Sequence, residues 1–274
     1  MKENQFRISD QDIELLIAYI KNNYGINLRS KKSLIIGRLQ NDLMRRNIPN
    51  FKTYYNDYIL ADKDGKEISY LVDKLTTNHT FFMRENMHFE YLKKVIFPYL
   101  EKTYVNTRDL RIWSAGCSSG EEPYVLAMVI NDYFGKNNNQ WDTKILATDI
   151  SAKALEIAKE GIYEDDKVNK IPEGYLRRYF KQHNNKYLID EKIKEDILFR
   201  RFNLMGDFSF KKKFQVIFCR NVMIYFDHDT KKALVEKFYD WTEKGGYLII
   251  GQSESINYDW NLYHQVMPSI YRKE

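Results

Sequence analysis

The chain has 274 residues, a length that suits two domains better than one. Hydrophobic residues make up 43% of it and it contains 21 Tyr and 16 Phe, which is enough material for a core and excludes general disorder. The net charge is only +5, and the chain shows neither an apolar run of about 18 residues nor an export leader, so we expect a cytoplasmic protein without membrane insertion.

The cysteines and histidines show no metal-binding pattern. Cys117 and Cys219 each end an apolar run and have no other ligand residue at a suitable spacing, so reduced thiols are expected. Five scattered histidines offer no pair with metal-ligand spacing. The sequence therefore predicts no metal site.

Residues 8–75 are predicted to form a small all-helical unit, because apolar residues recur there at helical spacing. Ser9 or Asp10 can cap the first helix, and Gly25 ends it. A second helix begins at Ser30 and is expected to end before a proline. Its buried stripe is expected to contain Leu34, Ile35, Leu39 and Leu43. Two further short helices are expected at 51–60 and 67–75.

The positive charge is concentrated in this unit. Between Lys21 and Lys52 there are eight Lys or Arg residues against one Asp, a local net charge of +7. This excess indicates either an acidic partner surface or simply a solvated helix face.

Beyond Leu110 the pattern changes to strands alternating with helices, which predicts a doubly wound, mostly parallel α/β sheet. The strands are expected at 110–114, 144–149, 214–219 and 246–251, and the helices at 123–134, 152–161 and 229–241. Between residues 175 and 203 the pattern differs. There the segments 187–189 and 197–199 look like paired short strands, and we predict an inserted antiparallel subdomain.

The first chemical motif is a loop of small residues between Gly116 and Gly120, which leads from a strand into a helix beginning with Glu121 and Glu122. The glycines let the backbone approach a ligand, and the helix N-terminus offers free N–H groups. The spacing is G-x-x-x-G, whereas a dinucleotide site has G-x-G-x-x-G, and the glutamates would repel a pyrophosphate. They suit a cationic amine and sulfonium, which favours S-adenosylmethionine. The alternative is a tight turn whose acids complement the helix dipole.

Two more motifs follow strands of the predicted sheet. Asp149 ends the second strand, where a carboxylate can accept hydrogen bonds from both ribose hydroxyls of an adenosine. Ser151 can cap the next helix, which leaves Asp149 available for a ligand. Arg220, Asn221 and Tyr225 follow the next strand, at the edge where open α/β sheets bind ligands. A buried guanidinium needs an anionic partner, which either a salt bridge or a substrate can supply.

Six segments, taken in order, resemble the chemoreceptor glutamate methyltransferase family known as CheR. They are TTNHTFFMRE at 76–85, WSAGCSSGEEPY at 113–124, ATDIS at 147–151, FNL at 202–204, FCRNVMIYFD at 218–227 and GGYLIIGQSE at 245–254. The resemblance spans nearly the whole chain and implies a class I, Rossmann-like methyltransferase fold. The implied parts are a helical receptor-recognition domain at 1–75, a linker at 76–85 that contributes to the active site, a methyltransferase domain at 86–274 and a β-subdomain near 176–202.

The resemblance implies S-adenosylmethionine as methyl donor, S-adenosylhomocysteine as product and glutamate methyl ester formation in bacterial chemotaxis as the reaction. The catalytic residues that it implies are Arg84, Arg220 and Tyr225. The residues that it implies for cofactor binding are Asn78, Thr80, Arg84, Gly116, Glu122, Asp149, Asn203, Leu204, Arg220 and Asn221.

The partner implied by the resemblance is the cytoplasmic domain of a chemoreceptor, facing the basic second helix through Arg38, Arg45 and Arg46. In some family members the β-subdomain docks a receptor pentapeptide, but the short turn between Phe180 and Tyr187 argues against that here. We expect a monomer that does not bind nucleic acid.

This chemistry needs no general base. A glutamate with a pKa of about 4.3 is already anionic at neutral pH, so the site has to supply position and desolvation. We expect Arg84 to position the acceptor or to organise cofactor contacts without clamping the attacking oxygen.

Two alternative functions remain open at this stage. One is a nucleic-acid methyltransferase, although the Asn/Asp-Pro-Pro-aromatic motif of amino-group enzymes is missing and the basic helix lacks interleaved aromatics. The other is a non-catalytic adaptor that binds the cofactor and docks receptors.

Overall fold

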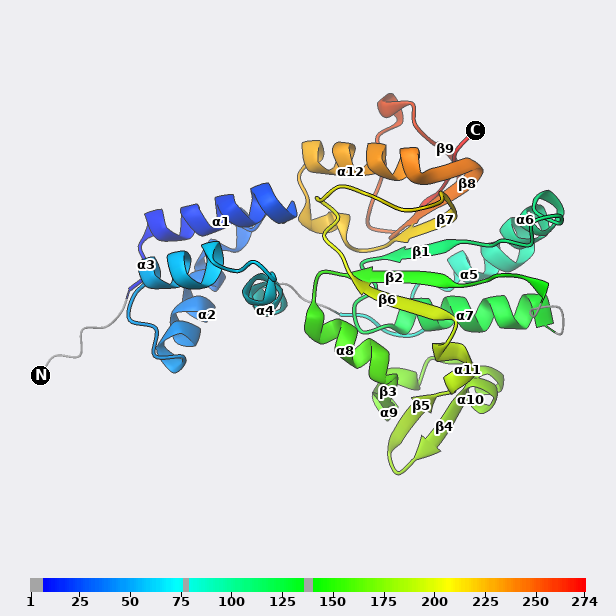
Figure 1. Cartoon of the computed structure of the whole chain (residues 1–274), viewed down its shortest axis with the longest axis horizontal. Helices are drawn as coiled ribbons and strands as arrows, with labels where there is room; N and C mark the ends of the chain where they lie inside the picture. The colour runs from blue at the N-terminus through cyan, green and yellow to red at the C-terminus, as the bar shows by residue number, and fades with distance from the viewer. Residues whose placement is uncertain (1–6, 76–78, 136–139) are drawn as a thin grey trace, which may run out of the picture. The chain divides into compact units, whose positions relative to one another are not determined.

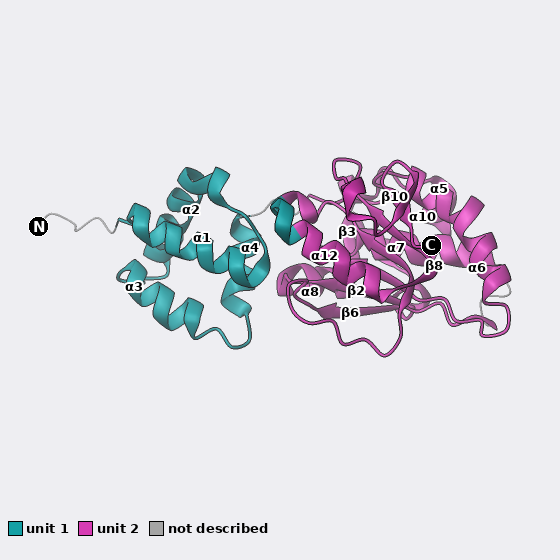
Figure 2. Ribbon diagram, turned by 90° about the horizontal axis from the view of Figure 1, so that it is seen from above, with its two compact units in different colours: residues 1–78, 225–230 teal, residues 79–224, 231–274 magenta. Residues whose placement is uncertain are grey.

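The computed structural model describes residues 7–75, 79–135 and 140–274 (Figure 1). The chain divides into two compact units, which Figure 2 colours separately. The first comprises residues 1–78 and 225–230, and the second residues 79–224 and 231–274. Asn78, for which cofactor binding is predicted, lies outside the described residues.

The first unit is helical, as predicted. Its helices are α1 (Asp10–Tyr24), α2 (Lys32–Arg45), α3 (Phe51–Thr53), the π-helical η2 (Tyr54–Leu60) and α4 (Lys66–Leu75), with the 3-10 turn η1 (Arg29–Lys31) before α2. Ser9 caps α1: its Oγ accepts from the backbone N–H of Asp12 at 3.1 Å, and the Asp12 carboxylate accepts from the N–H of Ser9 at 3.0 Å. Gly25 ends α1 in the left-handed region at φ 74°.

The buried stripe of α2 differs from the prediction at one position. It consists of Ile35, Leu39, Asp42 and Leu43, while Leu34 is 47% exposed. Asp42 lies on the same face as Ile35 and Leu39, where its carboxylate accepts a 2.5 Å hydrogen bond from the hydroxyl of Tyr70 on α4. Helical spacing places Leu34 beside this face, on the exposed side that carries Arg38 and Asn41. The expectation that Leu34 is buried was therefore wrong.

The second unit contains a seven-stranded sheet in the order β6-β2-β1-β7-β8-β10-β9 (Figure 1). The strands are β1 (Ile112–Ala115), β2 (Ile145–Asp149), β6 (Ile197–Arg201), β7 (Phe214–Cys219), β8 (Thr242–Ile250), β9 (His264–Met267) and β10 (Ile270–Arg272). The first five in the sheet order run parallel, and β10 pairs antiparallel with both β8 and β9. The predicted doubly wound, mostly parallel sheet is confirmed.

Helices cover both faces of this sheet, which explains why its strands are continuous apolar runs. They are α5 (Met87–Tyr91), the π-helical η3 (Leu92–Ile96), α6 (Phe97–Thr103), α7 (Glu121–Phe134), α8 (Ala152–Glu160) and α12 (His228–Trp241). On one face the ring of Trp113 lies 5.4 Å from that of Phe238 on α12. On the other face Phe218 stacks on Phe89 of α5 at 6.0 Å. Cys117 and Cys219, both among the described residues, are free buried thiols.

A separate three-stranded antiparallel sheet has the order β3-β5-β4 and is formed by β3 (Ile162–Glu164), β4 (Phe180–His183) and β5 (Lys186–Ile189) (Figure 1). An inserted antiparallel subdomain is therefore present, but the predicted pairing of 187–189 with 197–199 was wrong. The first segment is β5, paired with β3 and β4, whereas the second is β6, paired parallel with β2. The alternating pattern of a short strand indicates its faces and does not identify its partner.

The insertion consequently runs from β3 to just before β6, so it begins earlier in the chain than position 176. It also contains the short helices α9 (Asp165–Val168), α10 (Glu173–Tyr179) and α11 (Glu191–Lys194). Across the described ranges of both units, every helix is too short or too polar to cross a bilayer.

Candidate functional site

The candidate site lies at the carboxyl ends of β1, β2 and β7. From β1 the chain continues to β2 and β6 on one side, and later to β7 and β8 on the other. The strand order therefore reverses between β1 and β7, and open α/β sheets bind ligands in the crevice at such a point. The glycine loop follows β1, Asp149 ends β2, and Arg220 follows β7. Three predicted motifs thus meet at one edge.

Backbone conformation and close packing require glycine at both ends of the loop, at Gly116 and Gly120. Gly116 has φ +90°, and a Cβ atom there would overlap the Cγ2 methyl of Val222, which belongs to the loop after β7. Gly120 has φ +95°, and a Cβ atom there would lie 2.8 Å from the Cβ of Ala158. Both conformations disfavour any residue with a side chain. The loops after β1 and β7 therefore pack directly on each other, while the predicted approach of a ligand to Gly116 stays a prediction.

Replacing Gly116 with alanine is expected to lower the free energy of unfolding by about 3 kcal/mol, combining left-handed strain with overpacking. The double change Gly116→Ala, Val222→Ala should recover the share due to overpacking and leave the share due to φ. Urea unfolding of both variants, with Val222→Ala alone as reference, measures the two contributions. An unfolding midpoint of Gly116→Ala equal to that of the unchanged protein would contradict this description of the loop.

Asp149 ties together two loops of the site. Its Oδ2 accepts from the backbone N–H of Ser118 at 2.8 Å, and its Oδ1 accepts from the N–H of Ser151 at 2.8 Å. Ser151 caps α8 by accepting from the N–H of Ala154 at 3.0 Å, as predicted. Within the described part of the chain, the buried hydroxyl oxygen of Ser118 has no hydrogen-bond partner. A polar ligand beside this loop would satisfy that hydroxyl.

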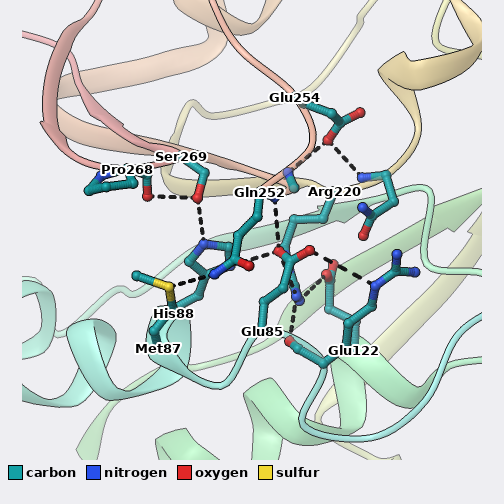
Figure 3. Close-up of polar contacts among 12 residues, drawn as sticks. Glu85, Met87, His88, Glu122, Arg220, Gln252, Glu254, Pro268 and Ser269 are labelled. Atoms are coloured by element: carbon teal, nitrogen blue, oxygen red, sulfur yellow. Dashed lines mark hydrogen bonds and ion pairs between the residues drawn. The ribbon is translucent and has the colours of Figure 1, made fainter.

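Arg220 is buried between two carboxylates, with only 3% of its side chain exposed (Figure 3). Its Nη1 donates to Oε2 of Glu122 at 2.9 Å, and its Nη2 and Nε donate to Oε2 of Glu85 at 3.2 and 3.3 Å. Nη2 also donates to the backbone carbonyl of Arg84. Of the two partners that the sequence allowed for this guanidinium, the structure contains the salt bridge.

Glu122 is held from two sides. Its Oε1 accepts from the hydroxyl of Ser114 on β1 at 2.7 Å, and its Oε2 accepts from Arg220. The acid that is predicted to hold the methionine part of a cofactor is therefore fixed in position by the strand beneath it and the arginine beside it. Fixed neighbours of this kind pre-organise a binding group.

Thr80 and Arg84 lie on the segment of residues 79–85, which precedes α5. Arg84 donates through Nη1 to the carbonyl of His79 at 2.8 Å, and its side chain is 30% exposed. Met83 and Glu85 on either side of it have φ 60° and 52°. Non-glycine residues in this region are strained and are concentrated at functional sites. With 30% of its side chain exposed against 3% for Arg220, Arg84 is the more accessible of the two predicted catalytic arginines.

The other predicted residues are distributed differently. Asn203 and Leu204 follow β6, where the Asn203 side chain accepts from the N–H of Met205 at 3.0 Å and Leu204 is buried. Tyr225 belongs to the helical unit, in which its carbonyl accepts from the N–H of Asn27 at 2.8 Å. The roles predicted for these residues in binding and catalysis stay predictions.

Glu254 was not singled out from the sequence. It follows β8 and is buried, and its carboxylate accepts from the backbone N–H groups of Asn221 and Gly251, both at 2.7 Å, and of Ile224 at 3.1 Å. It therefore fixes the loop that carries Arg220 and Asn221. Burial raises the pKa of Glu254, and the backbone N–H groups oppose that shift. The available signal was an acid three residues after Gly251, the glycine that follows this apolar strand.

His88 is a second residue that the sequence reading missed. It is fully buried, and its Nε2 lies 2.8 Å from Oγ of Ser269 (Figure 3). That hydroxyl donates its one proton to the carbonyl of Pro268 at 2.6 Å, so it accepts from His88 Nε2–H. Nδ1 lies 3.5 Å from Oε2 of Glu85. Burial, together with Arg220, lowers the pKa of His88 to about 4, so the ring is neutral at pH 7.

The lowered pKa of His88 predicts a loss of stability in acid. In the unfolded state His88 takes up a proton at its ordinary pKa of about 6.5, whereas in the folded state it does so only near pH 4. Between these two pH values the unfolded state binds more protons, so the free energy of unfolding decreases as the pH falls. The expected contribution is about 2 kcal/mol between pH 7 and pH 5. Urea unfolding at both pH values measures it. His88→Gln should reduce the difference, the exposed control His183→Gln should not, and equal pH dependence in both variants would refute the assignment.

The charges of the site are suited to a cationic ligand. Its acids are Glu85, Glu121, Glu122, Asp149 and Glu254, and its cations are Arg84, Lys167 and Arg220. Acidic groups are therefore in excess where a ligand of open α/β sheets binds. Together with the unsatisfied Ser118 hydroxyl, this donor set fits an adenosine ligand with an amine and a sulfonium, and does not fit a pyrophosphate.

Comparison with known proteins gives two family matches. Residues 11–76 match "CheR methyltransferase, all-alpha domain", and residues 78–271 match "CheR methyltransferase, SAM binding domain". A chemotaxis protein methyltransferase of Borreliella burgdorferi is 42% identical over 271 residues, which cover 97% of this chain and 95% of the relative. Chemotaxis protein methyltransferase 1 of Pseudomonas aeruginosa is 33% identical over 271 residues, covering 96% of this chain and 98% of the relative.

Proposed function

Because the chain belongs to the CheR methyltransferase family, whose all-alpha and SAM binding domains it both contains, we propose that it forms methyl esters on glutamate side chains of a chemoreceptor. S-adenosylmethionine-dependent methylation in chemotaxis is the activity of the chain, and the glutamate acceptor is the proposed part. The observation that carries this proposal is the buried Glu122–Arg220–Glu85 network at the carboxyl edge of the sheet, with the more accessible Arg84 beside it.

The residues present fit S-adenosylmethionine, which supplies an electrophilic methyl group on a sulfonium. Glu122 would hold the cationic methionine end, and Asp149 with the Ser118 hydroxyl would hold hydroxyls of the ribose. Asn203 and Leu204 would flank the base. Asp149 can accept ligand hydroxyls while it keeps its backbone bonds, because each carboxylate oxygen offers two acceptor positions.

A glutamate acceptor requires no general base from the site. The acceptor is anionic at neutral pH, so no proton has to be removed before attack. His88 is buried and bound to Ser269, which leaves it unsuited to proton transfer with a substrate. What the protein supplies is a fixed, dehydrated position.

The two arginines have different parts in this proposal. Arg220 donates to two carboxylates and a carbonyl, so most of its five N–H groups are already used within the protein. We therefore assign it to holding Glu122. Arg84 is the arginine that can orient an incoming carboxylate.

The proposed receptor surface is an exposed stripe on α2. It consists of Leu34, Gly37, Arg38, Asn41, Met44 and Arg45. These positions follow helical spacing and place apolar and basic side chains on one side, which suits an acidic receptor helix. Arg46 is not part of the stripe. Its guanidinium donates to both carboxylate oxygens of Glu67 at 2.6 and 2.9 Å, and its side chain is only 27% exposed. Arg45 donates to Asp42 at 2.9 Å and Arg38 to the carbonyl of Lys74 at 2.7 Å, but both lie on the exposed face, with 67% of the Arg45 side chain exposed, so the proposed contact rests on these two.

Reversing the charge of the stripe should weaken receptor binding. The double change Arg38→Glu, Arg45→Glu is expected to raise the Kd for a receptor cytoplasmic fragment about tenfold or more at low salt, and less at high salt. Titration calorimetry measures the Kd, and S-adenosylhomocysteine binding should be unchanged. Lys52→Glu is the matched control, since Lys52 is exposed on α3 outside the stripe. An equal loss in the control, or none in the double variant, would refute the proposed surface.

The two alternative functions are not favoured. A nucleic-acid enzyme is opposed by the family match, and a non-catalytic adaptor by the complete Glu122–Arg220–Glu85 network. Separate reactions with labelled S-adenosylmethionine and either receptor fragment or RNA distinguish them. Label on the receptor alone supports the proposal, whereas label on RNA or on neither substrate overturns it.

A further inference from the structure

The segment of residues 79–85, which carries Arg84 and Glu85, is packed against the β3-β5-β4 insertion. Phe82 is fully buried, and its ring meets that of Tyr163 on β3 edge-on at 4.8 Å. It also meets the ring of Phe180 on β4 edge-on at 5.6 Å. Aromatic pairs in this geometry are favourable beyond the area they bury. An apolar anchor therefore joins this segment to the small sheet.

A polar contact joins the same two parts on the other side of Phe82. Nζ of Lys167 on α9 donates to the carbonyl of Thr80 at 3.3 Å and lies 3.7 Å from Oε1 of Glu121. The side chain of Glu121, at the start of α7, is fully buried, and within the described residues its Oε1 accepts no hydrogen bond. The hydroxyl of Ser119 donates to the other oxygen at 2.7 Å, and the Lys167 ammonium supplies a positive charge beside this buried carboxylate. Lys170 adds a cation–π contact with the ring of Phe81 at 3.9 Å.

The backbone of the segment needs such support. Met83 and Glu85 both adopt left-handed φ angles, which residues with side chains disfavour. Such conformations persist when surrounding structure determines them. Glu85 is the last residue of the segment, and its carboxylate accepts a hydrogen bond from Arg220. A displacement of the segment would therefore move Arg84 and disturb the Glu85–Arg220 pair.

We propose that the insertion, which runs from β3 to just before β6, is a clamp that sets the position of residues 79–85, with Lys167 and Phe82 as positioning residues for methyl transfer. Lys167 joins three parts of the chain: the insertion, the carbonyl of Thr80 and the first turn of α7 at Glu121. The kinetic part of this inference rests on the proposed function, whereas the clamp itself is a property of the fold. A partner that binds the insertion would then reach the reaction site through these two residues.

The experiment compares four forms of the full chain: unchanged, Lys167→Met, Lys167→Arg and Lys186→Met. Lys167→Met removes the ammonium and keeps the side-chain length, while Lys167→Arg restores a cation. Lys186 is the matched control, because it lies on β5 of the same insertion and pairs only at the surface with Glu164 at 3.0 Å. Hydrogen–deuterium exchange of the peptide spanning 79–86 is measured first, and kcat and KM for methyl transfer to a receptor fragment second.

Lys167→Met is expected to accelerate exchange in the 79–86 peptide and to lower kcat by about tenfold to a hundredfold, with the KM for S-adenosylmethionine changed less. Lys167→Arg should recover most of both effects, and Lys186→Met should show neither. Phe82→Leu should act in the same direction. Unchanged exchange and kcat in Lys167→Met would overturn the clamp. The clamp would also be overturned if the activity of Lys167→Met fell only in proportion to a smaller fraction of folded protein. If the unchanged chain shows no methyl transfer, the proposed function fails, and the exchange data still decide the clamp.

Discussion

Replacing Arg220 with methionine is expected to lower the free energy of unfolding by about 3–5 kcal/mol and to abolish methyl transfer. The guanidinium is almost fully buried and compensates two carboxylates, those of Glu85 and Glu122. Methionine fills similar space but leaves both acids uncompensated in the interior, and removing one partner of a buried ion pair has a large cost. Glu122, the proposed anchor for the cationic end of the cofactor, loses the group that holds it.

Three further variants test this explanation. Arg220→Lys keeps a charge but not the planar fork that reaches both acids, so partial recovery of stability is expected. Adding Glu85→Gln to Arg220→Met removes one of the stranded charges and should restore part of the stability. Arg177→Met, at an exposed arginine, should leave the unfolding midpoint unchanged. Denaturant unfolding measures all of them, and an Arg220→Met protein as stable as the Arg177→Met control would contradict the network's role.

Replacing Arg84 with alanine is expected to lower kcat by about a hundredfold or more, while binding of S-adenosylhomocysteine changes only a few-fold. Arg84 is partly exposed and donates only to the carbonyl of His79 among the hydrogen bonds of the described residues. Its loss therefore removes orientation of the acceptor carboxylate more than it disturbs the fold. Glu122 and Asp149, the proposed cofactor ligands, keep all their bonds to the protein.

Single-turnover methyl transfer to a receptor fragment and calorimetric binding of S-adenosylhomocysteine separate the two effects. Arg84→Lys should lie between alanine and the unchanged protein, because a point charge attracts a carboxylate but does not orient it as a fork does. The assignment is wrong if Arg84→Ala transfers methyl groups at a rate within a few-fold of the unchanged protein. It is equally wrong if the cofactor affinity falls as much as the rate.

The parts of the fold that could be predicted from sequence are those with strong local signals. The capping residue Ser9 and the left-handed Gly25 identify the ends of α1, and the buried runs at Ile145–Asp149 and Phe214–Cys219 identify central strands. Their carboxyl ends meet at one edge because parallel strands with helical crossovers leave no other arrangement. Hence the neighbourhood of Gly116, Asp149 and Arg220 followed from the pattern alone.

What could not be predicted depends on contacts between distant residues. Nothing near β5 identifies β3 and β4 as its partners, because strand pairing is decided by the whole chain. In the sequence Arg46 is indistinguishable from the basic residues of α2, because its partner Glu67 lies 21 positions later in the chain. Glu85 and His88 resemble ordinary helix-start residues, and only the return of the chain at Arg220 and Ser269 places them in a buried network.

The most direct test of the central proposal is the chemical nature of the transferred methyl group. The full chain is incubated with labelled S-adenosylmethionine and a receptor cytoplasmic fragment, and the isolated receptor is then treated with mild base. A glutamate methyl ester hydrolyses under these conditions, so the proposal predicts that the label leaves the receptor as methanol. Label that stays on the receptor through base treatment would show methylation at nitrogen or at another stable position, and would contradict glutamate esterification.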